Sequence, residues 1–441
     1  LKPAISPEEK QAVHDIGEPG LLFGPREMRL YPNGQLAGHI LGGTTFGAQG
    51  VHSAEVIGMA GVEKAFDTFL RDPRFDGQPL QLSVDLTVQS ALEEALYGGM
   101  RLMNAKGASA VLMDAFSGEI VSLSSLPDFN PNNRPRPLTQ GDASDSALFN
   151  RAVQGVYELG SVFKAFTVAQ AMDLGLVEPD TLVDTKGPLR WGKHKISDYR
   201  DYGAQLSVEK VLIKSSNIGT ARLSLMIGAD LQKDFLDRLG LLQATPIEMI
   251  EGPTGRPQYP SNWSDISTMT ISYGHGISTS PVHLAAGYAT IVNGGTLVKP
   301  TVLKQPAAPR GARIISEKTS RHLRSMMRRV VTEGTAKMGD VPGYSVAGKT
   351  GTADKPSPQG GYYKDKVLAT FASFFPSTDP RYVLIVTLDE PEDRTGPEPR
   401  RTAGATAVPV AAEIIRRVAP LLGLAPEIEP TVQNGLTLAN N

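Results

Sequence analysis

The sequence contains no cysteine among its 441 residues, which excludes disulfide bonds, thiol nucleophiles and cysteine-ligated zinc. It also lacks any run of about 18 apolar residues, so no segment is expected to span a bilayer. An excess of charge of either sign is missing too, because 44 Lys and Arg face 46 Asp and Glu and leave a net charge of −2. This balance argues against a nucleic-acid-binding protein and against an acidic disordered chain.

The composition that remains is that of a globular protein, with 40% hydrophobic and 20% charged residues. The length predicts two or three domains. Residues 1–75 are rich in turns and glycine, apart from a helical pattern from Ala54 to Leu70, and are interpreted as a small separate domain or arm. Residues 425–441 are expected to form a frayed tail.

Hydrophobic periodicity predicts the elements between these two ends. Helices are expected over 86–104, 161–174, 207–226, 230–239, 281–293, 317–333 and 405–418. Strands are expected within 108–126, as a pair around a turn at Ser117-Gly118-Glu119, and over 366–375 and 381–388. Strands first, helices in the middle and strands again predict an α+β fold with an antiparallel sheet.

Two common kinds of catalytic site find no support in the sequence. Seven histidines are scattered along the chain, none in an H-E-x-x-H motif or at metal-ligand spacing, and no metal site is predicted. The G-x-S-x-G motif of the α/β-hydrolase nucleophile is absent as well.

The segment from Gly343 to Thr350 fits the phosphate-binding pattern G-x-x-x-x-G-K-[ST]. That pattern requires a helix directly after it, so that the helix N-terminus faces the phosphates. Gly351, Pro356 and Pro358 follow instead and disfavour a helix. The alternation of Tyr344 and Val346 predicts a strand that leads into Lys349, which argues against a nucleotide site.

The pattern S-x-x-K occurs twice, and its context separates the two copies. Ser207 precedes an amphipathic helix and is interpreted as its N-cap, with Lys210 on a solvated face. Ser161 and Lys164 open a helix that is apolar almost all round and therefore buried. Burial and the helix N-terminus lower the pKa of a lysine, and residues three apart share a face. A neutral Lys164 beside Ser161 would be a general base beside a nucleophile.

Two further motifs follow along the chain. Lys214-Ser215-Ser216-Asn217 is a polar segment at a helix end, and Ala347-Gly348-Lys349-Thr350-Gly351-Thr352 is placed at the end of a strand. A strand edge with glycines lets a substrate backbone lie alongside it, and the lysine and threonines suit a carboxylate.

The ordered set S-x-x-K, S-x-N and K-T-G resembles that of the penicillin-binding protein transpeptidases. The resemblance covers about residues 25–420 and includes the lead-in Tyr157-Glu158-Leu159-Gly160-Ser161, in which Leu159 replaces the usual proline. Ser272-Tyr273-Gly274-His275-Gly276 also matches, with His275 where an aromatic residue is common. Ser-Ser-Asn and Lys-Thr-Gly-Thr favour the septal, division-specific (FtsI-type) branch of the class B enzymes.

The resemblance implies a penicillin-binding, β-lactamase-like fold with three parts. These are a partial non-catalytic pedestal domain of the dimerisation type over residues 1–76, a transpeptidase domain over 77–424 and a flexible tail over 425–441. The chain starts at Leu1 without a visible signal peptide, so we expect a periplasmic portion of an inner-membrane protein whose anchor lies upstream.

The resemblance also implies a mechanism and a set of site residues. Ser161 would attack the penultimate D-Ala of a peptidoglycan stem peptide, Lys164 would take its proton and Ser215 would relay a proton to the leaving D-Ala. Asn217 would bind the substrate amide, and the backbone N–H groups of Ser161 and Thr352 would form the oxyanion hole. The substrate carboxylate would be held by the remaining motif residues, Lys349, Thr350 and Thr352, around Gly351.

The implied partners are peptidoglycan stem peptides, β-lactams bound covalently at Ser161, a membrane glycosyltransferase and divisome proteins. No nucleic acid, metal or organic cofactor is expected. The alternatives are an elongation-type enzyme, a β-lactamase, a D,D-carboxypeptidase or a β-lactam sensor of the same fold, a catalytically silent scaffold of the division machinery, and a P-loop nucleotide hydrolase.

Overall fold

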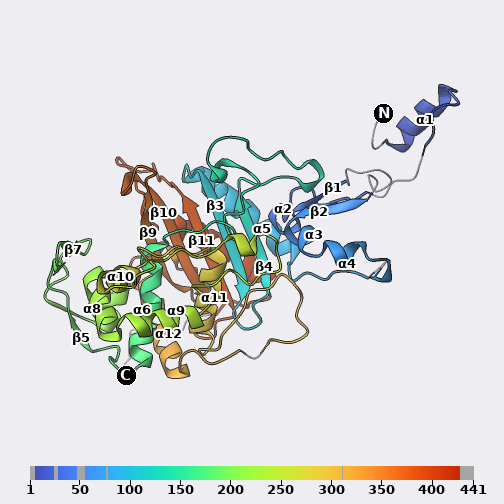
Figure 1. Cartoon of the computed structure of the whole chain (residues 1–441). Coiled ribbons are helices and arrows are strands. Elements are labelled where there is room, and N and C mark those ends of the chain that lie inside the picture. The colour runs from blue at the N-terminus through green and yellow to red at the C-terminus, as the bar shows by residue number, and fades with distance from the viewer. Residues whose placement is uncertain (1–4, 24–27, 47–54, 76–77, 310, 428–441) are drawn as a thin grey trace, which may run out of the picture.

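A five-stranded antiparallel sheet forms the centre of the computed structural model, which describes residues 5–23, 28–46, 55–75, 78–309 and 311–427 (Figure 1). Its strand order is β4-β3-β11-β10-β9. These strands are β3 (Gly107–Asp114), β4 (Ile120–Leu126), β9 (Ala347–Pro356), β10 (Tyr362–Phe375) and β11 (Tyr382–Asp389). The α+β class and the antiparallel sheet predicted from the sequence are therefore confirmed.

The sheet joins parts of the chain that lie far apart in the sequence, because β3 pairs with β11 over eight residues from Gly107↔Asp389 to Asp114↔Tyr382. Nearly every residue of these two strands is buried, so both faces of the sheet are covered. The helices α5 (Leu86–Leu102) and α13 (Ala407–Leu421) pack on each other and on one face, and α11 (Pro281–Val292) packs against β3 and β11 on the other.

A second group of helices lies beside the sheet, at the lower left of Figure 1, and surrounds α6 (Lys164–Asp173). All residues of α6 from Lys164 to Met172 are buried, as its apolar sequence predicts. The surrounding helices are α7 (Val208–Lys214), α8 (Asn217–Ile227), α9 (Ala229–Arg238), α10 (Asp265–Ile271) and α12 (Glu317–Thr332). The sequence analysis did not predict α10.

The single helix expected over 207–226 is wrong, because the chain breaks between α7 and α8 at Ser215. Ser215 has φ 61° and ψ 44°, a left-handed conformation that ends α7. Ser216 then caps α8 through its side chain, which accepts the N–H of Gly219. The predicted cap of α7 is confirmed, since the Ser207 side chain accepts the N–H of Lys210.

The helical pattern expected from Ala54 to Leu70 is also corrected. The strand β2 (Val56–Ala60) pairs antiparallel with β1 (Gly43–Phe46), and only then do the short helices α3 (Gly61–Ala65) and α4 (Asp67–Arg71) follow. Pairing with β1 outweighs the local periodicity, and Val56 and Ile57 are β-branched residues that favour strands. Ala54 lies outside the described residues, as do residues 428–441 of the expected tail.

Short elements connect these parts. They are α1 (Pro7–Asp15), α2 (Gly38–Leu41), η2 (Pro73–Phe75), η3 (Pro131–Asn133), η4 (Ala143–Asp145), η5 (Gly160–Phe163), β5 (Leu182–Asp184), β6 (Leu189–Trp191), β7 (His194–Ile196), β8 (Gln205–Ser207), η6 (Gly252–Thr254) and η7 (Lys337–Gly339). Within the described part of the chain, no helix combines the length and the apolar character that crossing a membrane requires. The division into pedestal, transpeptidase domain and tail stays a prediction.

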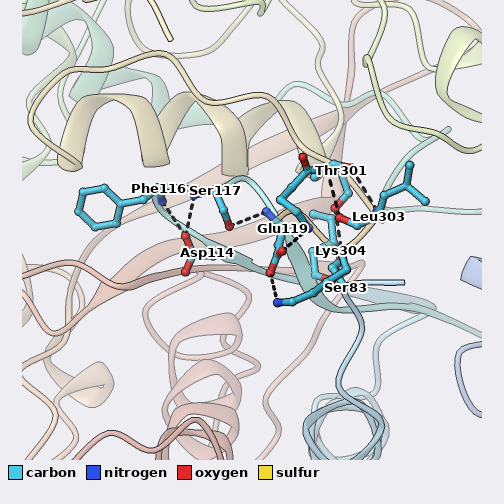
Figure 2. Close-up of polar contacts among 10 residues, drawn as sticks. Ser83, Asp114, Phe116, Ser117, Glu119, Thr301, Leu303 and Lys304 are labelled. Atoms are coloured by element: carbon cyan, nitrogen blue, oxygen red, sulfur yellow. Dashed lines mark hydrogen bonds and ion pairs between the residues drawn. The ribbon is translucent and has the colours of Figure 1, made fainter. Parts of the chain in front are cut away.

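The turn between β3 and β4, predicted at residues 117–119, fastens a distant segment to the sheet (Figure 2). Asp114 closes the turn by accepting the N–H groups of Phe116 and Ser117. The buried Glu119 carboxylate accepts from Lys304 Nζ at 2.7 Å and from the backbone N–H of Gln305 at 2.6 Å. This network holds the segment after α11 at the end of the sheet.

Candidate functional site

The turn that carries Ser161 is a short 3-10 helix, η5, which leads directly into α6. The helix expected to start at Ser161 therefore begins as a tighter turn, and its regular part starts at Lys164. Gly160 precedes it with φ +64°, and a Cβ there would lie 3.0 Å from the carbonyl oxygen of Thr352. The Tyr288 hydroxyl donates to the carbonyl of Val162 at 2.8 Å and holds the turn from α11.

Lys164 lies one turn beyond Ser161 and is 0% exposed. Its Nζ is 2.7 Å from Ser161 Oγ, 2.6 Å from Asn217 Oδ1, 3.0 Å from the Ser215 carbonyl oxygen and 3.2 Å from Ser215 Oγ. Burial, together with the nearby Lys349, holds the pKa of Lys164 well below its usual value, while Asp198 opposes the shift. The neutral amine is thus favoured.

The hydrogen-bond partners of a neutral Lys164 determine the direction in which its two N–H bonds and its lone pair point. Asn217 Nδ2 donates to the carbonyl of Ser197 at 3.1 Å, which fixes Asn217 Oδ1 toward the lysine. Two acceptor-only oxygens, Asn217 Oδ1 and the Ser215 carbonyl, then take the two N–H bonds of the amine. The lone pair that remains can accept the Ser161 hydroxyl proton, which is the arrangement that a general base requires.

The break between α7 and α8 presents Ser215 and Asn217 to Lys164. Asp198, from the loop after β7, fastens the start of α8. One of its carboxylate oxygens accepts the N–H groups of Asn217 at 2.5 Å and Ile218 at 3.0 Å, and the other accepts the Ser216 hydroxyl at 2.6 Å. A carboxylate at a helix N-terminus is also favoured by the helix dipole.

Lys349 reaches the same hydroxyl from the sheet. Its Nζ donates to Ser215 Oγ at 3.0 Å and to the Thr350 carbonyl at 3.1 Å, and burial lowers the pKa of Lys349 to about 7. The motif lies at the start of β9, not at the end of a strand as expected, because β9 begins at Ala347 and continues to Pro356. A strand where a P-loop needs a helix rules out the nucleotide site.

The strand β9 is an edge strand of the sheet, and it lies against the nucleophile turn. A Cβ on Gly351 would come within 2.2 Å of the Leu159 carbonyl oxygen, so only glycine allows this approach. Thr350 and Thr352 share one face of the strand. The Thr350 hydroxyl is 2.6 Å from that of Thr335, and Thr352 Oγ1 accepts the N–H of Ala403 at 2.9 Å.

The structure thus brings together the five residues predicted as catalytic, from four separate elements. Ser161, Lys164, Ser215, Asn217 and Lys349 form one connected set of polar contacts. Asp198 was missed by the sequence analysis, and no local signal links it to residues 216–218. Among the described residues, no group of three or more His, Asp or Glu is placed to hold a metal ion.

Comparisons with known proteins agree with this geometry. Residues 108–416 match the family model "Penicillin binding protein transpeptidase domain". The chain is 36% identical to the probable peptidoglycan D,D-transpeptidase FtsI of Caulobacter vibrioides, covering 95% of this chain and 70% of the relative. It is 29% identical to peptidoglycan D,D-transpeptidase FtsI of Escherichia coli, covering 96% of this chain and 72% of that protein.

A similar solved structure is the transpeptidase domain of penicillin-binding protein 3 from Burkholderia pseudomallei. It has a TM-score of 0.70 and 32% identity, and the match covers 80% of this chain and 99% of that one.

Proposed function

The chain belongs to the penicillin-binding protein transpeptidase family, and on this premise we propose that Ser161 is the residue it acylates and Lys164 the base. The enzyme is a peptidoglycan D,D-transpeptidase of the FtsI type, which cross-links stem peptides through a serine acyl-enzyme. The observation that supports the proposed site residues best is the contact of a buried, neutral Lys164 with Ser161 Oγ at 2.7 Å.

In the first half-reaction the Ser161 oxygen bonds to the carbonyl carbon of the penultimate D-Ala. The hydroxyl proton passes to Lys164 Nζ, the C–N bond to the terminal D-Ala breaks, and that amine receives a proton through Ser215 Oγ. Ser215 suits this relay because its hydroxyl lies 3.2 Å from Lys164 Nζ and 3.0 Å from Lys349 Nζ.

Substrate binding is assigned to the start of β9. Lys349 supplies positive charge near the substrate carboxylate, and the Thr350 and Thr352 hydroxyls are its proposed donors. Gly351 allows β9 to lie close to the turn that carries Ser161, since a Cβ there would come within 2.2 Å of the Leu159 carbonyl oxygen, and the substrate backbone is proposed to lie along the strand edge. The backbone N–H groups of Ser161 and Thr352 are the proposed oxyanion hole, and each such donor contributes on the order of 3 kcal/mol to catalysis.

In the second half-reaction the amine of a neighbouring stem peptide attacks the acyl-enzyme ester and releases Ser161. β-Lactams acylate the same serine, and we place the reaction in septal wall synthesis on the periplasmic side of the inner membrane. A membrane glycosyltransferase and divisome proteins are the proposed partners, since new glycan strands must be supplied at the site of cross-linking.

The test is intact-mass analysis after incubation with a penicillin, followed by peptide mapping. We expect a single stable adduct on the peptide that contains Ser161, and no adduct on the Ser161→Ala variant at an unchanged melting temperature. An adduct on that folded variant would disprove the assignment of the nucleophile.

The lifetime of the adduct separates the transpeptidase from a β-lactamase of the same fold. A β-lactamase needs a base that activates water against the ester. The direct polar partners of Lys164 are instead hydroxyl, carbonyl and amide groups, which favours a long-lived adduct. Rapid return of free enzyme and hydrolysed penicillin would favour the β-lactamase.

A further inference from the structure

A row of rings and one carboxylate extends outward from the catalytic lysine. The Tyr273 ring centroid lies 5.9 Å from Lys164 Nζ, the His275 ring is 5.4 Å from that of Tyr273, and the Tyr362 ring is 6.1 Å from that of His275. The Tyr362 hydroxyl then donates to Glu158, at 3.1 and 3.0 Å from its two carboxylate oxygens. We name these four residues, Tyr273, His275, Tyr362 and Glu158, the acceptor wall.

The acceptor wall is fixed directly to the nucleophile turn. Glu158 precedes Ser161 by three residues, and its Oε1 accepts the backbone N–H of Gly276 at 2.8 Å. The N–H of Gly160 donates to the carbonyl of Gly274 at 3.3 Å, so the loop that carries Tyr273 and His275 lies against the residue before Ser161. Glu158 and Ser161 are therefore held at a defined separation by the backbone around them.

The outer end of the wall has a negative character. Among the described residues, no lysine or arginine forms an ion pair with Glu158, whose carboxylate accepts hydrogen bonds from one backbone N–H and one tyrosine hydroxyl. Tyr362 is 47% exposed. Burial raises the pKa of Tyr362 to about 12, and the negative charges of Glu158 and Asp354 add to the shift. Lys164 and Lys349 are buried, and burial lowers the pKa of both lysines, so they carry less positive charge than exposed lysines do.

A row of aromatic rings whose outer member, Tyr362, is exposed and which ends at a carboxylate without an ion-pair partner among the described residues is suited to a cation. Ammonium groups bind ring faces within about 6 Å and form charge-assisted hydrogen bonds with carboxylates. The proposed reaction has one cationic substrate, the amine of the acceptor stem peptide, which is protonated in water at neutral pH. The donor stem peptide instead presents a carboxylate, which is assigned to Lys349 on β9.

We propose that the acceptor wall is the binding site of the acceptor stem peptide, with Glu158 receiving its ammonium group and the rings of Tyr362 and His275 guiding it toward Ser161. The inference rests on the proposed function and deepens it, since it assigns the second substrate to residues outside the catalytic set.

The acyl group then passes from Ser161 to the amine of the acceptor stem peptide. The bound ammonium loses one proton to water and becomes a neutral amine. Its nitrogen bonds to the carbonyl carbon of the acyl-enzyme, its second proton passes through Lys164 Nζ to Ser161 Oγ, and the ester C–O bond breaks. Water competes with the amine for the same ester, so a poorly held acceptor increases hydrolysis at the expense of cross-linking.

The experiment separates these two fates of the acyl-enzyme. The full chain is given an N-acyl-D-alanyl thioester as donor and a soluble stem peptide with one free amine as acceptor. Thiol release reports acylation, and mass spectrometry gives the ratio of amide product to hydrolysed acid. Glu158→Gln keeps an oxygen that can accept from Gly276 and Tyr362 but removes the charge. We expect it to raise the acceptor concentration needed for equal partition about tenfold.

The same variant is expected to release thiol and to react with penicillin at rates within about twofold of the wild type, which also shows that it is folded. Tyr362→Ala should shift partition in the same direction. Glu398→Gln, which removes an exposed carboxylate from the loop after β11, is the matched control and should leave partition unchanged. Added salt should weaken transfer in the wild type more than in Glu158→Gln, because it screens the charge.

Three results would overturn the inference. Glu158→Gln could leave partition unchanged, or it could slow acylation and transfer equally, in which case Glu158 only shapes the nucleophile turn. A wild type that is acylated but gives no amide product would also contradict it. Absence of thiol release from the wild type is a different result, because it would refute the proposed function itself.

Discussion

Two buried amines meet at the hydroxyl of Ser215, with Lys164 Nζ at 3.2 Å and Lys349 Nζ at 3.0 Å. Two ammonium groups at this separation repel each other, so full protonation of both is disfavoured. The contacts support the proposed division of roles, in which Lys164, next to Ser161, is the neutral base and Lys349 on β9 carries the charge that attracts a carboxylate. A proton-relaying hydroxyl between them fits both roles.

The division of roles predicts a bell-shaped pH dependence for acylation by penicillin. The rate rises with pH while Lys164 loses its proton, since only the neutral amine accepts one. The rate falls above about pH 7, where Lys349 loses its charge. Lys349→Arg keeps a permanent charge and should abolish the alkaline fall while lowering the maximal rate. Second-order acylation rates measured across the pH range where both proteins stay folded provide the test.

Residue types and spacing were enough to predict that Ser161 and four further polar residues lie together, because the order of the motifs along the chain does not depend on the elements between them. Residues that only the tertiary fold brings to the site could not be predicted from the sequence. Asp198 reaches α8 from a loop 18 residues earlier, and only the fold shows that its carboxylate accepts from Ser216, Asn217 and Ile218.

The helix break at Ser215 is the element that makes the site possible. A continuous helix over 208–227 would keep the Ser215 carbonyl within its own hydrogen bonds, whereas the left-handed residue turns this carbonyl and the side chain toward Lys164. A left-handed conformation costs a residue with a Cβ on the order of 1 kcal/mol. The strained position is the one at which the proposed mechanism gives the side chain a chemical role.

The left-handed conformation of Ser215 predicts that substitutions there change the stability of the protein and its reaction with penicillin independently of each other. Ser215→Gly removes both the hydroxyl and the Cβ, whereas Ser215→Ala removes only the hydroxyl. We expect the glycine variant to be more stable than the alanine variant by about 1 kcal/mol in urea unfolding. Both should react with penicillin much more slowly than the wild type. Equal stability of the two variants would show that the left-handed conformation carries no strain.

Helices and strands were predicted correctly where one hydrophobic periodicity continued over the whole element. The prediction failed where pairing with a distant strand determined the secondary structure. The helix α5 and the strand pair β3–β4 match the expectation within a few residues. The strand β2 was predicted as part of a helix because its pairing partner β1 is separated from it in the sequence by residues 47–54. The strand β9 was predicted to end near Lys349 because glycines are common at strand ends, whereas it begins at Ala347 and continues to Pro356. The break after α7 carried a signal that was not used, since Ser-Ser-Asn contains strong N-cap residues.

On the scale of the whole molecule, α5 and α13 connect the beginning and the end of the catalytic region. They pack closely enough that a Cβ on Gly99 would lie 2.6 Å from Cγ1 of Val410. The neighbouring Gly98 has open space around the position of a Cβ, with no described atom from outside its own helical turn within 4 Å. The two glycines thus differ in tertiary packing while sharing one helix.

This difference predicts opposite effects for two neighbouring substitutions. Gly98→Ala should stabilise the protein by about 0.5–1 kcal/mol, because alanine is the better helix former and nothing opposes it. Gly99→Ala gains the same propensity but forces Val410 aside, and should destabilise by about 1–3 kcal/mol. Thermal unfolding of the two variants gives the comparison. A stabilised Gly99→Ala would mean that α13 moves away without cost.

The pairing of β3 with β11 also governs the order in which a newly made chain can fold. Synthesis yields β3, β4 and α6 first, while the strands β9 and β11 are made more than 170 residues after α6 begins, at about residues 347 to 389. Until then the edge of β3 that faces away from β4 has no strand to pair with, and unpaired strand edges are prone to aggregation. It also means that a chain synthesised only as far as α12 holds Ser161 without Lys349, so reactivity is expected only once β9 has been made and placed.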